Sequence, residues 1–379
     1  MNDLYRQFGS IIGSVLGGTV LSTHDYRWKE LAPLFDKHNL TPVLNVCITN
    51  NHIDSSVAST VKNKSLRLLS IQVNQMHEIE QLRALFDEKG IDNLFVKGTV
   101  TSNRYPRPEF RTMGDIDVLY RVDQHELLKE SLLGFGYSNY QEGRKNDTFS
   151  KGKYISLETH RQLVPSDSGF YEWCDGIWDR CSLLDGYSHS YAMTIEDEIV
   201  FNIIHFAIHF LEGGAGARFL CDVYVYSHLE YDRQHVEKEL EGLGLLEFYK
   251  TVTGVANNWF DDSGIDNDLY DRVIDYVMGG GVFGTATNAQ ALRVEDGGTR
   301  YLLRHFFPSY KEMCSLYPWL KGKVVLLPFA WCKRGVNTLI HKKGAVTRSV
   351  AASKNVDKDK INHIRNLYND CGLNMKLRD

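Results

Sequence analysis

Apolar residues recur at helical spacing through most of the first 88 residues. Trp28, Leu31 and Phe35 mark one such stretch. A longer stretch runs from Ser65 to Glu88, and its broad apolar stripe is formed by Leu66, Leu68, Leu69, Val73, Met76, Ile79, Leu82 and Leu85. Because residues three and four apart share one face of a helix, this part of the chain is predicted to be an N-terminal helical region.

Two short stretches of this region are harder to assign. Thr41–Val46 fits either a helix that opens at Pro42 or a short strand. Ile11–Leu21 resembles the apolar core of a signal peptide, but it follows a weak n-region and precedes no small-residue cleavage site. We therefore expect an N-terminal helix at that position.

Short apolar runs replace the helical pattern after residue 88. Ile91–Val96 is predicted to be a buried strand that leads into Lys97-Gly98. A basic, proline-containing loop, Gly98–Phe110, separates it from Arg111–Tyr120, whose β-branched character predicts a second strand. These two strands would form the centre of a sheet.

A helix over about 124–133 follows, and then Lys153–His160 alternates between apolar and polar residues. That alternation predicts a strand with one polar face, which carries Ser156, Glu158 and His160. The order of these elements favours a small mixed sheet with helices packed on one side.

The chain from residue 191 onward is predicted to be helical. Thr194 and the acidic residues after it are typical of a helix start, and Ile199–Leu211 continues that helix. Further helices are expected from about Ala217 and over about 234–260, 266–278 and 285–305. The final fifty or so residues are basic and polar, and we expect loose packing there.

The sequence thus predicts an α+β fold with three regions. A small mixed β-sheet core (89–190) would be flanked by N-terminal helices (1–88) and by a mainly α-helical C-terminal domain (191–379).

Composition narrows the class of function. The 379 residues carry a net charge of −5, which disfavours an extended nucleic-acid-binding surface. The seven cysteines are scattered and form no Cys-x-x-Cys pair, which favours free thiols in a reducing cytoplasm. No apolar run is long enough to span a bilayer.

Asp115 and Asp117 are the strongest chemical signal. Residues two apart in a strand point to the same face, so these carboxylates would lie side by side. Two like charges repel unless a cation lies between them, which favours a Mg²⁺ site. Glu158 on the polar face of a neighbouring strand is the candidate third carboxylate. An Asp-x-Asp pair alone also occurs in calcium loops, in glycosyltransferases and at solvated strand ends.

Cations and glycines near these acids suit a phosphate. Lys97-Gly98 follows a strand, where a loop can approach a triphosphate. Arg111 could offset the paired charges or bind a phosphate with both arms of its guanidinium group. Gly114 leaves room for a close approach of backbone or phosphate.

Several motifs together resemble a known family. They are Phe95-Val96-Lys97-Gly98, Tyr105-Pro106, Arg111–Leu119, Gly136-Tyr137, Leu157-Glu158-Thr159-His160, His205 with His209, and Arg218–Asp222. Over roughly residues 25–230 the chain resembles the uncharacterised nucleotidyltransferases of the DNA polymerase beta superfamily found in bacterial gene clusters.

The resemblance implies an activity and a set of residues. Asp115, Asp117 and Glu158 would be the catalytic carboxylates and the ligands of Mg²⁺ or Mn²⁺. A nucleoside monophosphate would pass from an NTP to a hydroxyl of a small molecule, a glycan or a protein, with release of pyrophosphate. The partners would be the NTP and an acceptor of unknown identity.

The loop after the first strand departs from the superfamily. The usual Gly-Ser or Gly-Gly-Ser is replaced by Lys97-Gly98-Thr99, in which Thr99 would supply the hydroxyl or Lys97 a compensating charge. This departure supports an alternative function, a catalytically inactive nucleotide-binding or scaffold protein that retains the fold. A glycosyltransferase that uses a nucleotide sugar is a third interpretation, which the short sheet disfavours.

A second group of residues is predicted to line the pocket. His205 and His209 share one face of an apolar helix, and His160 completes a conceivable zinc-binding trio. We prefer a structural or pocket-lining role for them, with Arg218 and Asp222 as hydrogen-bonding neighbours.

Residues 321–334 combine apolar residues with flanking cations and a tryptophan. This pattern suits peripheral contact with a membrane surface. The alternative is a packed element with a solvated basic rim.

Overall fold

The structure is a computed structural model. It describes residues 1–19, 21, 26–50, 55–143, 146–212, 214–280, 307, 310, 313, 317–320, 322–341 and 358–373. The helix expected over 285–305 lies outside the described residues, as do residues 342–357 and 374–379 of the basic C-terminal segment.

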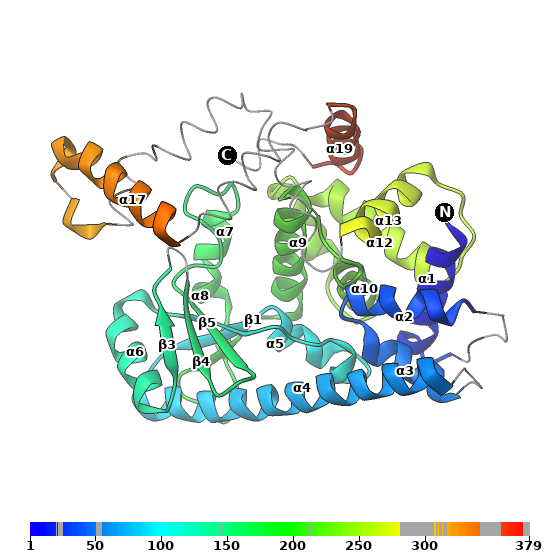
Figure 1. Ribbon diagram of the computed structural model, residues 1–379, viewed down its shortest axis with the longest axis horizontal. Coiled ribbons are helices and arrows are strands. Elements are labelled where there is room, and N and C mark those ends of the chain that lie inside the picture. The colour runs from blue at the N-terminus through cyan, green and yellow to red at the C-terminus, as the bar shows by residue number, and fades with distance from the viewer. Residues whose placement is uncertain are drawn as a thin grey trace.

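The described residues form one seven-stranded mixed sheet, which confirms the predicted α+β fold (Figure 1). Helices pack on both faces of this sheet, so the expectation of helices on one side was wrong. The strand order is β3-β4-β5-β2-β1-β7-β6. Their bounds are β1 Asn93–Val96, β2 Ile116–Tyr120, β3 Ser138–Gln141, β4 Asn146–Lys151, β5 Ile155–His160, β6 Ser182–Leu183 and β7 Ser190–Ala192.

The register of the central strands positions the acidic residues. β1 runs antiparallel to β2 and pairs Val96 with Asp117. β2 runs parallel to β5 and pairs Asp117 with Glu158. Since paired residues of adjacent strands point to the same face, Asp117 and Glu158 lie next to each other, as the alternation in the sequence predicts.

Helices supply most of the remaining structure. Their bounds are α1 Asp3–Leu16, α2 Trp28–Lys37, α3 Thr41–Asn50, α4 Ser55–Lys89, α5 Gly98–Thr101, α6 His125–Gly134, α7 Tyr171–Asp175, α8 Ile177–Arg180, α9 Ile195–Leu211, α10 Ala217–Ser227, α11 Arg233–Gly242, α12 Leu246–Phe260, α13 Asp268–Gly280, α17 Leu327–His341 and α19 Lys358–Asp370. Short 3₁₀ turns are η1 Ser102–Arg104, η2 Pro108–Phe110, η3 Val122–Gln124, η4 Pro318–Leu320 and η5 Val324–Leu326. The ambiguous stretch Thr41–Val46 is therefore helical.

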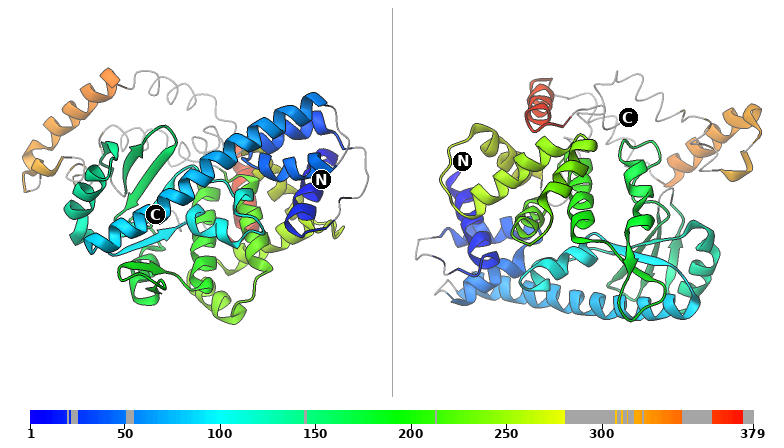
Figure 2. Two further views of the ribbon diagram at one scale, coloured as in Figure 1. Left: turned by 90° about the horizontal axis from the view of Figure 1, so that it is seen from below. Right: turned by 180° about the vertical axis from the view of Figure 1, so that it is seen from behind.

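The 35-residue helix α4 extends from the N-terminal helices to the far side of the sheet (Figures 1 and 2). Its last turns bury Leu82 and Phe86 against one face of the sheet. The predicted apolar stripe is wrong further back, because Leu66 and Val73 are 54% and 57% exposed. There the buried face is polar, and Gln72 donates hydrogen bonds to loop carbonyls instead.

The N-terminal helices pack directly on the C-terminal ones. The indole Nε1 of Trp259 in α12 donates to the carbonyl of Tyr5 in α1 at 2.8 Å, and Phe8 stacks on the same indole. Both sets of helices contribute to one hydrophobic core, which also reaches the sheet at Leu94 and Val96. The division into three regions stays a prediction.

The segment predicted to contact a membrane contains η5 and the start of α17. Val325 and Phe329 are 91% and 65% exposed there. Within the described residues, no helix combines the length and apolar character needed to cross a bilayer. Membrane-surface contact by residues 321–334 stays a prediction.

Substitution of Gly13 tests the contact between α1 and α12. A Cβ atom at Gly13 would overlap the carbonyl group of Phe260. Gly13→Ala should lower the free energy of unfolding in urea by about 1–3 kcal/mol. Gly134→Ala is the matched control, because it lies at the exposed end of α6 with no atom within 4 Å of its Cβ position. Equal stability of the two variants would show that α1 does not pack this way.

Candidate functional site

The candidate site lies where β2 and β5 present their acidic side chains. Asp115 precedes β2, Asp117 lies within it, and Glu158 is its neighbour in β5. The Asp117 side chain is 5% exposed, whereas that of Glu158 is 27% exposed. The site therefore combines one buried carboxylate with a more accessible one.

Two basic side chains compensate the buried charge of Asp117. Lys97 donates from Nζ to Oδ1 at 2.6 Å, and His160 Nε2 lies 2.7 Å from the same oxygen. Burial alone would raise the pKa of Asp117, but Lys97 and His160 outweigh it and hold that pKa well below its usual range. Asp117 is thus ionised throughout the physiological range.

Asp115 has the opposite electrostatic balance. Burial, together with the charges of Asp117 and Glu158, raises its pKa to about 6 against the attraction of Lys97 and Arg218. Burial is the largest cause of this shift, and the two neighbouring carboxylates add an excess of negative charge at this position. A bound cation would relieve that excess.

The backbone at Lys97 is strained. Its φ of 54° and ψ of −133° lie in a region that residues other than glycine avoid, at a cost of order 1–3 kcal/mol. The next residue is closely packed, because a Cβ at Gly98 would lie 3.2 Å from Met113 and 3.3 Å from the Arg111 guanidinium, and those side chains would have to shift to admit it. The tight turn after β1 directs the Lys97 ammonium to Asp117.

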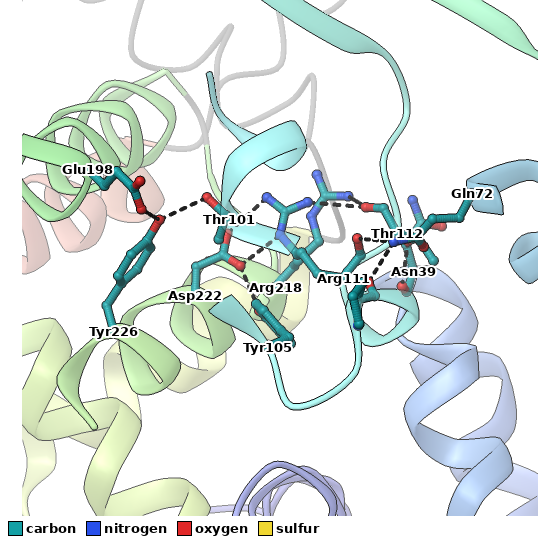
Figure 3. A network of polar contacts seen from close by, with 11 residues as sticks. Asn39, Gln72, Thr101, Tyr105, Arg111, Thr112, Glu198, Arg218, Asp222 and Tyr226 are labelled. Atoms are coloured by element: carbon teal, nitrogen blue, oxygen red, sulfur yellow. Dashed lines mark hydrogen bonds and ion pairs between the residues drawn. The ribbon is translucent and has the colours of Figure 1, made fainter. Parts of the chain in front are cut away.

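Arg111 has a different partner from the one expected. Its Nε and Nη2 donate to the two oxygens of Asp222 in α10, at 2.7 and 2.9 Å (Figure 3). Tyr105 donates to the same carboxylate at 2.6 Å, and the remaining nitrogen Nη1 donates to the carbonyl of Thr112. Arg111 therefore connects the loop before β2 to α10 and is not directed at the paired aspartates.

Arg218, which like Asp222 belongs to α10, lies beside Arg111 (Figure 3). Its Nη1 donates to the carbonyl of Thr112 at 3.1 Å, and its buried Nε has no hydrogen-bond partner among the described residues. Burial and the positive charge of Arg111 lower its pKa to about 10. A guanidinium with an unused donor, on a residue that lines the same cleft as the carboxylates, is suited to bind an anion.

The structure brings most of the predicted site residues to one cleft of about 250 Å³, which we call the carboxylate cleft. It is lined by Lys97, Gly98, Arg111, Gly114, Asp115, Asp117, Glu158, His205, His209 and Arg218, with Met113 and Phe219. Thr99, His160 and Asp222 are not among these residues, and His160 lines the adjoining cavity beside β5. The Thr99 hydroxyl is buried without a hydrogen-bond partner in the described structure, and Asp222 is bound to Arg111.

His205 and His209 of α9 contact each other, with their Nε2 atoms 2.9 Å apart. Burial and the nearby charges of His209 and Lys97 hold the pKa of His205 well below its ordinary value, so it is neutral. Their partners thus differ from the predicted Asp222 and Arg218.

One compact group of possible metal ligands includes a residue predicted only to line the pocket. Ligand atoms of Asp117, Glu158 and His160 lie within 4.8 Å of one another. Carboxylate oxygens suit Mg²⁺ or Mn²⁺, and the imidazole is more typical of Mn²⁺ or heavier ions. The excess charge at Asp115 also fits a cation. Among the described residues, His205 and His209 do not belong to this group, so the three-histidine zinc arrangement is not formed.

Comparison with known proteins identifies the family. Residues 24–261 match the model of a family described as uncharacterised nucleotidyltransferase. The chain belongs to this family. No curated protein and no solved structure matches it.

The nucleotidyltransferase site contains features that sequence patterns did not reveal. The bonds from Lys97 to Asp117 and from Arg111 to Asp222 join residues that are far apart in the chain. The position of His160 was predictable from the local sequence. It lies two residues after Glu158 in β5, so the two side chains point to the same face of the sheet.

Asp115→Asn tests whether the negative charge of Asp115 lowers the stability of this nucleotidyltransferase. Because the folded-state pKa of Asp115 exceeds its ordinary value of 3.8, ionised Asp115 lowers stability above pH 6, and the effect disappears as the pH falls towards 3.8. With EDTA present, the variant should be more stable than the wild type at neutral pH by roughly 1–2 kcal/mol. The difference should vanish near pH 4. A pH-independent difference measured by thermal unfolding would contradict this account.

Proposed function

We propose that the protein is a Mg²⁺- or Mn²⁺-dependent nucleotidyltransferase of the DNA polymerase beta-like superfamily. It would transfer a nucleoside monophosphate from an NTP to a hydroxyl of a small molecule, a glycan or a protein. The observation that carries the proposal is the in-register pairing of Asp117 with Glu158 beside Asp115, in one cleft with Lys97 and Arg218.

The divalent cation would be held by Asp115, Asp117 and Glu158, with His160 next to them. When bound, it would supply positive charge to the phosphates and lower the pKa of the acceptor hydroxyl. These residues support the proposal because their charge is incompletely compensated at Asp115.

Lys97 and Arg218 are suited to bind the triphosphate. Both border the carboxylate cleft, and the unused Nε of Arg218 can donate to a phosphate oxygen. Positioning of this kind contributes most of the catalysis expected in phosphoryl transfer. The sequence predicted that Arg111 binds a phosphate and that Arg218 is a pocket-lining neighbour. Because Arg111 is bound to Asp222, we assign the phosphate to Arg218 instead.

The transfer step balances without a further reactant. The acceptor oxygen forms a bond to the α-phosphorus, and the bond from that phosphorus to the bridging oxygen breaks. The electron pair leaves with pyrophosphate. Glu158, which is more accessible than its strand neighbour Asp117, accepts the hydroxyl proton.

The bond between Lys97 and Asp117 also favours a second candidate, a non-catalytic nucleotide-binding protein. An ammonium 2.6 Å from Asp117 already neutralises much of the charge that a metal would neutralise. Thermal-shift measurements with ATP, CTP, GTP and UTP, each with and without Mg²⁺, separate the two. Metal-dependent stabilisation with pyrophosphate release supports the enzyme, and stabilisation without release supports the binding protein.

Asp117→Asn should abolish Mg²⁺-dependent NTP turnover. The substitution removes the charge at the centre of the carboxylate group while it keeps the size of the side chain. Pyrophosphate release from each of the four NTPs, in the presence of a panel of hydroxyl acceptors, is the measurement. Asp123→Asn, on an exposed turn outside the cleft, should retain wild-type turnover. Unchanged turnover in the Asp117 variant would overturn the assignment.

Arg218→Gln should weaken the binding of an NTP with Mg²⁺ by roughly 10- to 100-fold, which corresponds to the loss of a charge-assisted hydrogen bond. Arg107→Gln is the control, because Arg107 is exposed and paired with Glu109. Isothermal titration gives both dissociation constants. If the two variants bind equally well, Arg218 does not bind the triphosphate.

A further inference from the structure

Two more cavities adjoin the carboxylate cleft. One, of about 220 Å³, lies beside β1 and β7 and is called the β7 cavity here. The other, of about 170 Å³, lies beside β5 and is called the β5 cavity. Lys97 and His205 border all three spaces, so the three meet at these two side chains.

Helix α9 forms a common wall of the three spaces. Glu198 and Asn202 line the β7 cavity, His205 lies at the junction, and Ile208 and Glu212 line the β5 cavity. These positions are three to four residues apart and therefore follow one face of the helix. One helix face thus borders all three spaces, which we treat as the lobes of one three-lobed space.

The two outer lobes differ in their access to the acids. Glu158 and His160 line the β5 cavity, whereas the β7 cavity contains none of the three site carboxylates. An acceptor hydroxyl must reach Glu158 to lose its proton, and this requirement places the acceptor on the β5 side. The pyrophosphate leaves towards the cations of the carboxylate cleft. With the acceptor in the β5 cavity and the pyrophosphate in the carboxylate cleft, the β7 cavity remains for the nucleoside.

We propose that the β7 cavity binds the nucleobase of the NTP. This inference rests on the proposed nucleotidyltransferase function and adds to it the place where the base is recognised.

The lining of the β7 cavity suits a flat heterocycle. Phe95, Tyr191 and Phe201 supply aromatic surface. The volume of the cavity is below the roughly 300–1,000 Å³ typical of drug-sized ligands, which favours one ring system.

Among the cations that line the cavity, Arg104 is paired with Glu198 by two hydrogen bonds of 2.9 and 2.8 Å, and Lys97 is paired with Asp117. Arg83 lies over the Phe95 ring at 4.6 Å, and its buried Nη1 has no hydrogen-bond partner among the described residues.

Asn202 provides a means of distinguishing bases. Asn202 is 8% exposed and lines the β7 cavity, and its Oδ1 has no hydrogen-bond partner among the described residues. A buried amide oxygen without a partner is costly, and the amino group of a base can satisfy it. An NTP whose base carries an amino group should therefore bind more tightly than UTP.

Filling each outer lobe in turn tests the assignment. Ala192→Trp fills the β7 cavity from the edge of β7, and Ile208→Trp fills the β5 cavity as the matched control. Isothermal titration with Mg²⁺ would use two probes, an NTP analogue with a methylene group between the α- and β-phosphorus atoms, and inorganic tripolyphosphate.

Ala192→Trp should weaken binding of the analogue by roughly tenfold or more and leave that of tripolyphosphate unchanged. Ile208→Trp should leave both within about twofold. Unchanged analogue binding in Ala192→Trp, or a loss confined to Ile208→Trp, would overturn the inference while the proposed function stands. If the wild-type protein binds neither probe, the proposed function itself fails.

Asn202→Leu is a second, smaller change, and unlike the two tryptophan variants it introduces no large side chain into the cavity. It should reduce the preference for amino-bearing bases over UTP by roughly tenfold, with tripolyphosphate binding unaffected. Thermal unfolding of each variant confirms that it folds. An unchanged order of the four NTPs in Asn202→Leu would contradict the role of the β7 cavity.

Discussion

The compensation of one buried carboxylate organises this structure. Asp117 is almost inaccessible to solvent, and an isolated ionised carboxylate at such a depth would be strongly unfavourable. Lys97 and His160 reach the same oxygen from β1 and β5, so the three central strands meet at this charge. The strain at Lys97 is consistent with this demand, because the turn must direct its ammonium inward.

A second buried ion pair joins the sheet to the helices above it. Arg111 and Asp222 connect the loop before β2 to α10, and Glu198 of α9 binds Arg104 of η1 in the same way. These bonds hold α9 and α10 over the carboxylates and so form the walls of the three-lobed space. Arg218 lines the cleft as a buried cation, and its Nε has no hydrogen-bond partner among the described residues. The architecture thus separates structural charges from those available to a substrate.

Local patterns in the sequence were sufficient to predict the central strands and most helices. The alternation around Glu158 and the spacing of Asp115 and Asp117 predicted that Asp117 and Glu158 lie next to each other, because strand periodicity determines which side chains share a face. The β3–β4 hairpin was missed, since its strands carry few apolar residues and bury Asp147, which is paired with Arg161. The partner of Arg111 had no local signal because Asp222 lies 111 residues further along the chain.

The most direct test of the account is a crystal structure of the protein grown with Mn²⁺ and a non-hydrolysable NTP analogue. The account predicts an anomalous peak within coordination distance of Asp115, Asp117 and Glu158, triphosphate oxygens at Arg218, and Lys97 moved from Asp117 towards the phosphates. A site without a Mn²⁺ peak, in which Lys97 still donates to Asp117 and the nucleotide lies elsewhere, would contradict it.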